Sequence, residues 1–116
     1  MKAALQQLLD RSLPLPGVAA CCALLPDRSC VSRCYNDWFQ TGQGEQALSR
    51  LAAAADGLLD HGIRPLQVNW VFEHIRIHLA VRRDAACLAL FVEIRPGVDN
   101  GKLAGLLEEF AALPAG

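Results

Sequence analysis

The sequence has 116 residues, of which 53% are hydrophobic and 20% are charged, and its formal net charge is −1. This length predicts a single domain, residues 1–116, with one hydrophobic core. A charge so close to neutral argues against nucleic acid as a partner, because nucleic-acid binding needs a basic surface that displaces counterions. The apolar fraction is slightly high for a small domain, which indicates an apolar face kept for self-association or for a partner.

The first residues do not have the pattern of a targeting segment. Gln6, Gln7, Asp10 and Arg11 interrupt the apolar run that a secretory signal peptide needs. No stretch reaches the roughly 18 uninterrupted apolar residues of a membrane helix, so we expect no membrane association. The five cysteines are odd in number, which is untypical of a disulfide framework. We therefore expect a cytoplasmic protein with reduced thiols.

The first third of the chain predicts a helix and a β-hairpin. Leucines recur at helical spacing over residues 2–13, and the prolines that follow end this helix. The short apolar run 18–25 and the alternating run 30–35 flank a turn at Pro26–Ser29. Runs of this length on either side of a turn predict two paired strands.

A second helix is predicted over residues 45–61, after a glycine-containing loop at residues 41–44. Gly62 is placed to cap its C-terminus. The residues at helical spacing that we expect to face the core are Leu48, Leu51, Ala52, Ala55, Leu58 and Leu59.

The same helix carries a second stripe, rotated away from the leucines. It consists of Arg50, Ala53, Ala54 and Gly57. Small side chains allow another helix to approach closely. The alternative is an alanine-rich face in contact with solvent, since alanine has the highest helix propensity.

The second half of the chain predicts a three-stranded meander, at 66–73, 75–82 and 87–94, and a final helix at 99–112. Alternation is strict in the middle strand, where isoleucine, leucine and valine share one face. The short breaks make neighbouring strands antiparallel, because a parallel return needs a long crossover. The order α-β-β-α-β-β-β-α predicts an α/β (α+β) fold, a five-stranded antiparallel sheet with helices on both faces.

The segment FEHIRIH, residues 72–78, raises the question of a metal site. On a helix, His74 and His78 would share a face and form a zinc-binding pair. On a strand they are roughly 13 Å apart, at about 3.3 Å per residue, which is too far for two ligands of one ion. The alternation favours the strand, so we expect His78 on a polar sheet face with Arg76 and Arg82, and His74 in a turn.

A thiol cluster is an open alternative for the cysteines. Cys21 or Cys22, Cys34 and Cys87 would come together if their strands were neighbours. However, the sequence has no CxxC pair with zinc-finger spacing, and free cysteines commonly act as small buried hydrophobes. We therefore expect no metal and no cofactor.

The sequence contains no catalytic signature. It has no GxSxG elbow, no glycine-rich phosphate loop and no GxGxxG motif. Glu73 is isolated in a predicted turn, and Glu108 and Glu109 fit a solvated helix face. Because no acid, base and nucleophile come together, we expect a protein that is not an enzyme and has no catalytic residues.

Two aromatic pairs have two interpretations. Trp38 and Phe39 precede the second helix, and Trp70 and Phe72 alternate with Val68 on the third strand. Aromatic side chains bury large areas, which favours packing in the core. The functional alternative is that some of them anchor a partner.

The layout resembles the roadblock (dynein light chain) family over nearly the whole chain. An opening leucine helix is followed by LPGVAACCALL, residues 15–25, which is similar to the family's LPGV entry into its first strand. The helix at 45–61 leads into a three-stranded meander, and PGVDNGKLAGLLEEF, residues 96–110, resembles the family's terminal helix after a turn. Family members usually carry Asp-Gly in the first hairpin, whereas this chain has Pro26-Asp27-Arg28-Ser29-Cys30.

The resemblance implies a profilin-like sandwich without enzymatic activity. Such proteins dimerise through the second helix and third strand, which joins two sheets, and bacterial and archaeal members often regulate or scaffold small Ras-like GTPases. The implied partners are a second copy of the chain and a small GTPase or other signalling protein. Carried onto this chain, the interface comprises Arg50, Ala53, Ala54, Gly57, Gln67, Asn69 and Val71.

Two alternatives to this function are open. A secretion-type chaperone that binds an effector segment is also small, α/β and dimeric, but such chaperones tend to be strongly acidic, unlike a chain of net charge −1. A small thiol or metal protein would use the cysteines instead.

Overall fold

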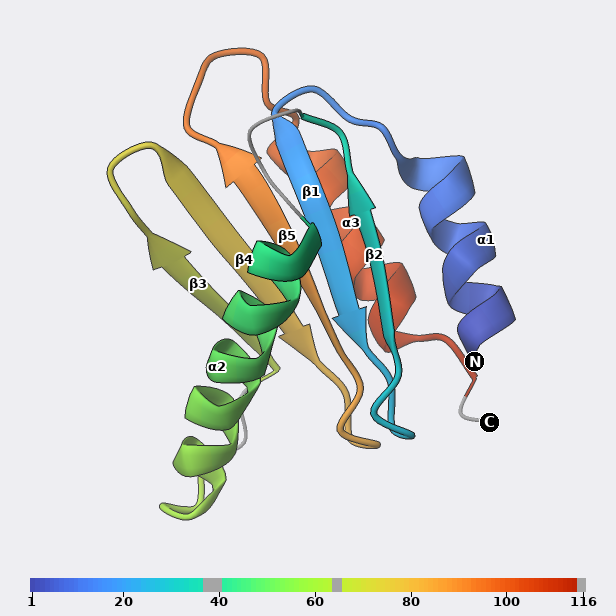
Figure 1. Ribbon diagram of the computed structural model, residues 1–116, viewed down its shortest axis with the longest axis vertical. Helices are drawn as coiled ribbons and strands as arrows, with labels where there is room; N and C mark the ends of the chain where they lie inside the picture. Colours follow the sequence, from blue (N-terminus) through green and yellow to red (C-terminus); the bar gives the residue numbers. More distant parts are fainter. Residues whose placement is uncertain (37–40, 64–65, 115–116) are drawn as a thin grey trace.

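A single antiparallel sheet with helices on both faces forms the protein. The computed structural model describes residues 1–36, 41–63 and 66–114, and only the backbone of residues 41–43. The strand order is β2-β1-β5-β4-β3, and all neighbours are antiparallel. Figure 1 shows α2 in front of the sheet and α1 and α3 behind it. The elements are α1 (Lys2–Ser12), β1 (Val18–Leu24), β2 (Cys30–Cys34), α2 (Thr41–Leu59), β3 (Gln67–Val71), β4 (Ile75–Val81), β5 (Cys87–Glu93) and α3 (Asn100–Ala111).

This order confirms the predicted fold class, and the bounds agree within one or two residues, except at the start of α2. The segment 41–44, predicted as a loop, is the first turn of α2. That prediction was wrong because tertiary contacts override the low helix propensity of glycine. Gly44 is buried, and the hydroxyl of Ser32 on β2 donates a hydrogen bond to Glu45 Oε1 at 3.3 Å.

The larger core lies between the sheet and the α1–α3 layer. Leu5, Leu8 and Leu9 of α1 are fully buried, which follows from the leucine spacing that predicted this helix. They pack with four residues of α3, with inward residues of β1 and with those of β5. The four residues of α3 are Leu103, Leu106, Leu107 and Phe110. Asp99 caps α3 by accepting a hydrogen bond from the backbone N–H of Lys102 at 3.1 Å.

A smaller core lies on the opposite face, under α2. Leu48 and Ala55 of α2 pack there with strand residues that are mostly small. These strand residues are Ala20, Cys22, Ile77, Leu79, Cys87, Ala89 and Phe91. Ala47, Leu51 and Ala52 of α2 are half-buried and pack against the same core, so the helix is held along residues 47–55.

The alternation of β4 is confirmed, but one face differs from the prediction. Ile77 and Leu79 enter the α2-side core, and Ala80 enters the α1–α3 core. The face with Arg76, His78 and Arg82 was expected to be polar. It is instead the border of the larger core, because β4 lies partly under α3 and next to β5, in which every residue before Glu93 is apolar.

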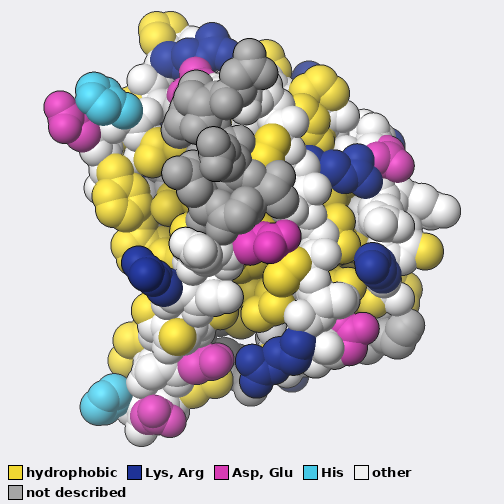
Figure 2. All heavy atoms as spheres, in the orientation of Figure 1, with side chains coloured by type: hydrophobic (Ala, Val, Ile, Leu, Met, Phe, Trp, Pro, Cys, Tyr) yellow, Lys and Arg dark blue, Asp and Glu magenta, His cyan; other side chains and the backbone are white. Residues whose placement is uncertain are grey.

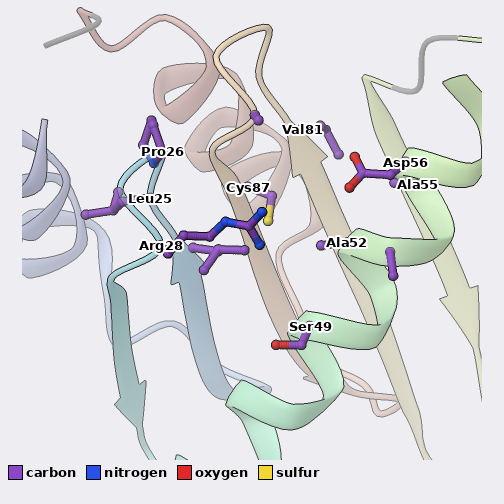
Figure 3. Close-up of a pocket in the computed structure, with 12 residues that line it drawn as sticks. Leu25, Pro26, Arg28, Ser49, Ala52, Ala55, Asp56, Val81 and Cys87 are labelled. Atoms are coloured by element: carbon purple, nitrogen blue, oxygen red, sulfur yellow. The ribbon is translucent and has the colours of Figure 1, made fainter.

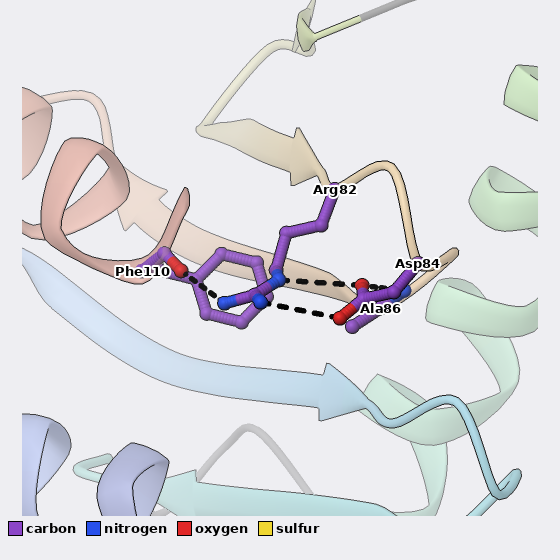
Figure 4. A network of polar contacts seen from close by, with 4 residues as sticks. All are labelled: Arg82, Asp84, Ala86 and Phe110. Carbon is purple, nitrogen blue, oxygen red and sulfur yellow. Dashed lines mark hydrogen bonds and ion pairs between the residues drawn. The ribbon is translucent and has the colours of Figure 1, made fainter. Parts of the chain in front are cut away.

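Arg82 shows how a charged residue is accommodated at this border (Figure 4). Its side chain is 7% exposed and forms an ion pair with Asp84 at 3.1 Å. Its Nη1 donates to the carbonyl of Phe110 at 2.8 Å, and its guanidinium lies 5.6 Å from the centre of the Phe110 ring. The side chain therefore ties the β4–β5 turn to the last turn of α3, where a cation is favoured by the helix dipole.

Candidate interaction surface

The second half of α2 extends beyond the sheet. Leu58 is 38% exposed and Leu59 is 46% exposed, although both were predicted to face the core. That part of the prediction was wrong because the helical period gives the direction of a side chain but not the point where the underlying sheet ends. In Figure 1 the lower end of α2 projects past the strands.

The end of α2 is sharply defined. Gly62 has φ +76°, its N–H donates to the carbonyl of Leu59 at 2.9 Å, and the N–H of Ile63 donates to Leu58 at 3.0 Å. This pair of bonds is a Schellman motif, and it confirms Gly62 as the predicted cap. The apolar surface continues past the cap, where Ile63 is 54% exposed and Leu66 is 63% exposed.

The small-residue stripe on α2 lies on the outer side of the helix. Arg50, Ala53, Ala54 and Gly57 are all exposed. A methyl group built at Gly57 would meet no atom within 4 Å, so nothing in the described chain covers this position. The stripe is therefore accessible to a second helix, which is the geometry that the predicted interface requires.

The strand β3 is an edge of the sheet and pairs only with β4 in the described chain. The carbonyl of Leu66 accepts from the N–H of Val81, and the N–H of Phe72 donates to the carbonyl of Ile75. Leu66 and Phe72 are therefore hydrogen-bonded to β4. Since bonded and non-bonded residues alternate along an antiparallel strand, the backbone groups of residues 67, 69 and 71 point away from β4. Those residues are the predicted Gln67, Asn69 and Val71, which are all exposed.

The two parts of the predicted interface lie on different faces of the sheet. Asn69 pairs with His78, and Gln67 pairs with Ala80, which is buried on the α1–α3 side. Directly paired residues share a face, so the side chains of Gln67 and Asn69 point away from the α2 layer. An interface that includes both the α2 stripe and β3 would therefore use the backbone edge of β3 and not the side chains of Gln67 and Asn69.

The aromatic residues of β3 divide between core and surface. Trp70 is half-buried against the α2-side core, which agrees with the packing interpretation. Phe72 is 51% exposed at the end of the strand. Trp38 and Phe39 lie outside the described residues.

Sequence reasoning missed that exposed apolar side chains gather at the end of α2 and along β3. In the described residues, six of the seven large hydrophobic side chains that are exposed fall within residues 58–72. They are Leu58, Leu59, Ile63, Leu66, Val71 and Phe72, and the seventh is Ile94. Figure 2 shows hydrophobic side chains gathered on the side of this face that carries β3. The available signal was the run of large apolar residues on both sides of the Gly62 cap, in a segment too short for a further core element.

Two of the cysteines, Cys22 and Cys87, share the α2-side core, whereas His74 and His78 lie apart from it. His74 lies in a turn, as predicted, with its Nε2 3.5 Å from Glu73, and both side chains are 88% exposed. His78 is on β4, and burial lowers the pKa of its imidazole, with a smaller contribution from Arg76. In residues 1–36, 41–63 and 66–114, no three potential ligands are close enough to hold a metal ion.

The buried thiols are poor nucleophiles. Burial raises the pKa of Cys21 and of Cys22 to about 12 and that of Cys87 to about 11. Cys21 faces the α1–α3 layer and Cys22 faces α2, so these neighbours in sequence lie in different cores. A reactive cysteine needs a lowered pKa, and these thiols have the opposite shift.

Within the described chain, none of the three helices is both long enough and apolar enough to cross a bilayer.

The comparisons with known proteins bear on the fold. The sequence matches no protein-family model and no curated protein. Three solved structures superpose well, although their sequence identities are low. Myxococcus xanthus MglB has a TM-score of 0.71 at 10% identity and covers 95% of this chain and 86% of its own. A roadblock/LC7 domain from Streptomyces avermitilis has a TM-score of 0.61 at 14% identity, covering 97% and 95%.

A structure of MglB in a tetrameric arrangement has a TM-score of 0.66 at 13% identity, covering 95% of this chain and 87% of that one. At sequence identities this low, the structural similarity establishes the fold but not the function. The similarity that the sequence suggested is confirmed at this level: the chain has the roadblock fold.

Proposed function

We propose that this protein is a roadblock-like homodimer that acts as a non-enzymatic regulator or scaffold for a small Ras-like GTPase. The observation that carries the proposal is that most of the large exposed hydrophobic side chains of the described chain lie at the end of α2 and beside the open edge of β3, namely Leu58, Leu59, Ile63, Leu66, Val71 and Phe72. Exposed apolar side chains that gather in one region of a small protein mark an interaction site, whereas single scattered ones do not. The roadblock fold favours the same surface, because members of the family that the sequence resembles dimerise through their second helix and third strand.

The choice between the two sheet edges favours β3. The other edge, β2, also has only one neighbour, but none of its described residues is a large exposed hydrophobe. In the proposed dimer, the outward backbone groups of Gln67, Asn69 and Val71 bond to those of a second copy. The α2 helices then pack through Ala53, Ala54 and Gly57, and Leu58 lies next to them, four residues after Ala54. A two-fold arrangement satisfies both contacts, since the same surface is used twice.

The proposed activity depends on surface complementarity. The buried cysteines are protonated at neutral pH, which is consistent with a protein that holds a partner rather than transforming a substrate. The GTPase is proposed from the resemblance to roadblock proteins, whose bacterial and archaeal members often regulate or scaffold such enzymes. We infer that the dimer, and not the single chain, presents the complete docking surface.

The dimer is tested with one matched pair of variants. Ala54→Glu places a charge in the small-residue stripe, and Ala104→Glu places the same charge on an exposed position of α3. Sedimentation velocity of the wild-type chain is expected to give twice the 12.5 kDa chain mass. Ala54→Glu is expected to give the mass of one chain and Ala104→Glu that of the dimer. A wild-type monomer, or an equal effect of both variants, contradicts the proposal.

The GTPase partner is tested by binding. The Ras-like GTPases of the same genome are loaded with GDP or with a non-hydrolysable GTP analogue and passed over the immobilised protein in biolayer interferometry. At least one is expected to bind with a preference for one nucleotide state. Ala54→Glu should weaken this binding and Ala104→Glu should not. If no GTPase binds in either state, the regulatory role is wrong even where the dimer is confirmed.

A further inference from the structure

A cavity lies between the middle of α2 and the two turns at the end of the sheet, on the side of α2 away from β3. Its volume is about 290 Å³, and Figure 3 shows the residues that line it. The cavity remains open because α2 presents small side chains there, Ser49, Ala52 and Ala55, opposite Leu24 and Val81 of the strands. This volume is just below the usual range of ligand sites, about 300–1,000 Å³, so the cavity would hold only a small molecule.

Arg28 enters this cavity from the β1–β2 turn. Its backbone has φ +73°, a left-handed conformation that glycine adopts freely and other residues adopt at a cost. The turn is fixed by hydrogen bonds of 2.9 Å from the N–H of Leu25 to the carbonyl of Ser29 and from the N–H of Arg28 to the carbonyl of Leu25. Because glycine adopts this conformation without cost, Arg28→Gly removes the side chain from the cavity without straining the turn.

The opposite wall carries the opposite charge. Asp56 of α2 lines the same cavity, and Figure 3 shows it across from the β1–β2 turn that carries Arg28. Within residues 1–36, 41–63 and 66–114, the two side chains form no ion pair with one another. Between them, the wall is apolar and uncharged, because burial keeps the thiol of Cys87 protonated, with its pKa raised to about 11.

We propose that this cavity binds a small zwitterion with an apolar body, in the form of a free aliphatic α-amino acid. Its carboxylate pairs with the guanidinium of Arg28, its ammonium group pairs with the carboxylate of Asp56, and its side chain lies against Leu24, Val81 and Cys87. Arg28 and Asp56 are both exposed to solvent, so a ligand with one charge would gain only one of the two ion pairs, whereas a zwitterion gains both.

The site is beside the proposed dimer surface and does not depend on it. Ser49 and Asp56 are seven residues apart and share a flank of α2, whereas Ala54 and Gly57 lie on another side of the helix. Only Ala53 belongs to both the cavity wall and the predicted interface. Binding is therefore expected in the Ala54→Glu variant as well, so that failure of the dimer and failure of this site give different results.

The test is a titration followed by amide chemical shifts, with L-leucine, L-isoleucine, L-valine and L-methionine as probes. At least one is expected to bind saturably at millimolar concentration or below, with shifts centred on the β1–β2 turn and the middle of α2. N-acetyl-L-leucine lacks the ammonium group and L-leucinamide lacks the carboxylate. Each is expected to bind at least tenfold more weakly than L-leucine.

Two variants assign the charges. Arg28→Gly relieves the left-handed backbone, so it is expected to melt at a higher temperature than the wild type while losing at least tenfold in amino-acid affinity. Asp56→Asn is expected to lose affinity for L-leucine but not for N-acetyl-L-leucine. Asp60→Asn, an exposed position outside the cavity, is the control. Absence of binding by all four amino acids, binding of either analogue as tightly as L-leucine, or unchanged affinity in Arg28→Gly would overturn the proposal.

Discussion

Arg82 carries its charge into the border of the larger core, with its side chain 7% exposed. It bonds to Asp84 and to the carbonyl of Phe110, so its removal takes the ion pair from a part-buried carboxylate and one of the donors from a helix-terminal carbonyl. We expect Arg82→Ala to lower the free energy of unfolding by about 2–3 kcal/mol. Urea denaturation measures this. The neighbouring Arg83 is exposed, and Arg83→Ala should change stability by less than about 0.5 kcal/mol. Equal effects of the two variants would show that Arg82 has no special role.

His78 makes stability depend on pH. Its pKa is lowered in the folded state from the ordinary value of 6.5, mainly by burial and also by Arg76. Below about pH 6.5 the unfolded chain therefore takes up a proton before the folded chain does. Stability should fall as the pH decreases from 6.5 through the folded-state pKa, by at most about 1.4 kcal/mol per pH unit from this one group.

The variant His78→Gln removes this titration. We expect its unfolding free energy, measured by urea denaturation between pH 7.5 and 5, to fall less steeply than that of the wild type. His74→Gln replaces a histidine whose side chain is 88% exposed and serves as the control. A wild-type slope retained in His78→Gln but lost in His74→Gln would reverse the assignment.

At this scale the sequence predicts which residues share a face but not what surrounds them. The alternation of IRIHLAVR, residues 75–82, placed Arg76, His78 and Arg82 on one face, yet it did not indicate that α3 packs beside them. The environment of a side chain depends on elements that are distant in sequence, and the period of one strand contains no information about them.

Among the elements, α2 shows most clearly what periodicity can and cannot predict. Its core direction was predicted correctly for Leu48 and Ala55, which are buried, and wrongly for Leu58 and Leu59, which are exposed. All four residues lie on or near one side of the helix. The difference arises because α2 crosses the sheet obliquely and extends past its margin (Figure 1), a relation between two elements that no local pattern specifies.

This difference gives a prediction in the monomeric Ala54→Glu background, where association does not contribute. Leu48→Ala removes a side chain that is 1% exposed and should lower the free energy of unfolding by about 2–4 kcal/mol. Leu58→Ala removes one that is 38% exposed and should lower it by about 1 kcal/mol or less. In the wild-type background, sedimentation should show that Leu58→Ala weakens the dimer. A larger loss from Leu58→Ala than from Leu48→Ala in the monomer would mean that Leu58 belongs to the core.

The strands were easier to predict than α2 because short, bounded apolar runs leave few choices of register. The hairpin β1–β2 and the meander β3–β4–β5 followed from adjacent runs and turns. The pairing of β1 with β5 joins residues about 70 positions apart, such as Cys21 and Leu90, and no sequence pattern predicts it directly. It follows only from the requirement that the hairpin β1–β2 and the meander β3–β4–β5 join in one sheet to cover their apolar residues.

In the whole molecule, the distribution of apolar surface differs between the two ends of the sheet. The β2 edge lies beside α1, while the β3 edge carries or adjoins the exposed side chains of Leu66, Val71 and Phe72. An open strand beside an apolar surface invites pairing with another chain. The sequence has a net charge of −1 and no basic or acidic block. Association should therefore depend on the shape and the apolar side chains of the β3 edge and not on electrostatic steering.

The measurement that tests the central claim most directly is hydrogen exchange of backbone amides as a function of protein concentration. The outward amides of Gln67, Asn69 and Val71 are expected to exchange slowly at high concentration and to become fast on dilution or in Ala54→Glu. Amides along β2 should exchange at the same rate throughout. This result is predicted if two copies join through β3 and α2. Concentration-dependent protection of β2 instead of β3, or outward β3 amides that exchange fast at every concentration, would contradict it.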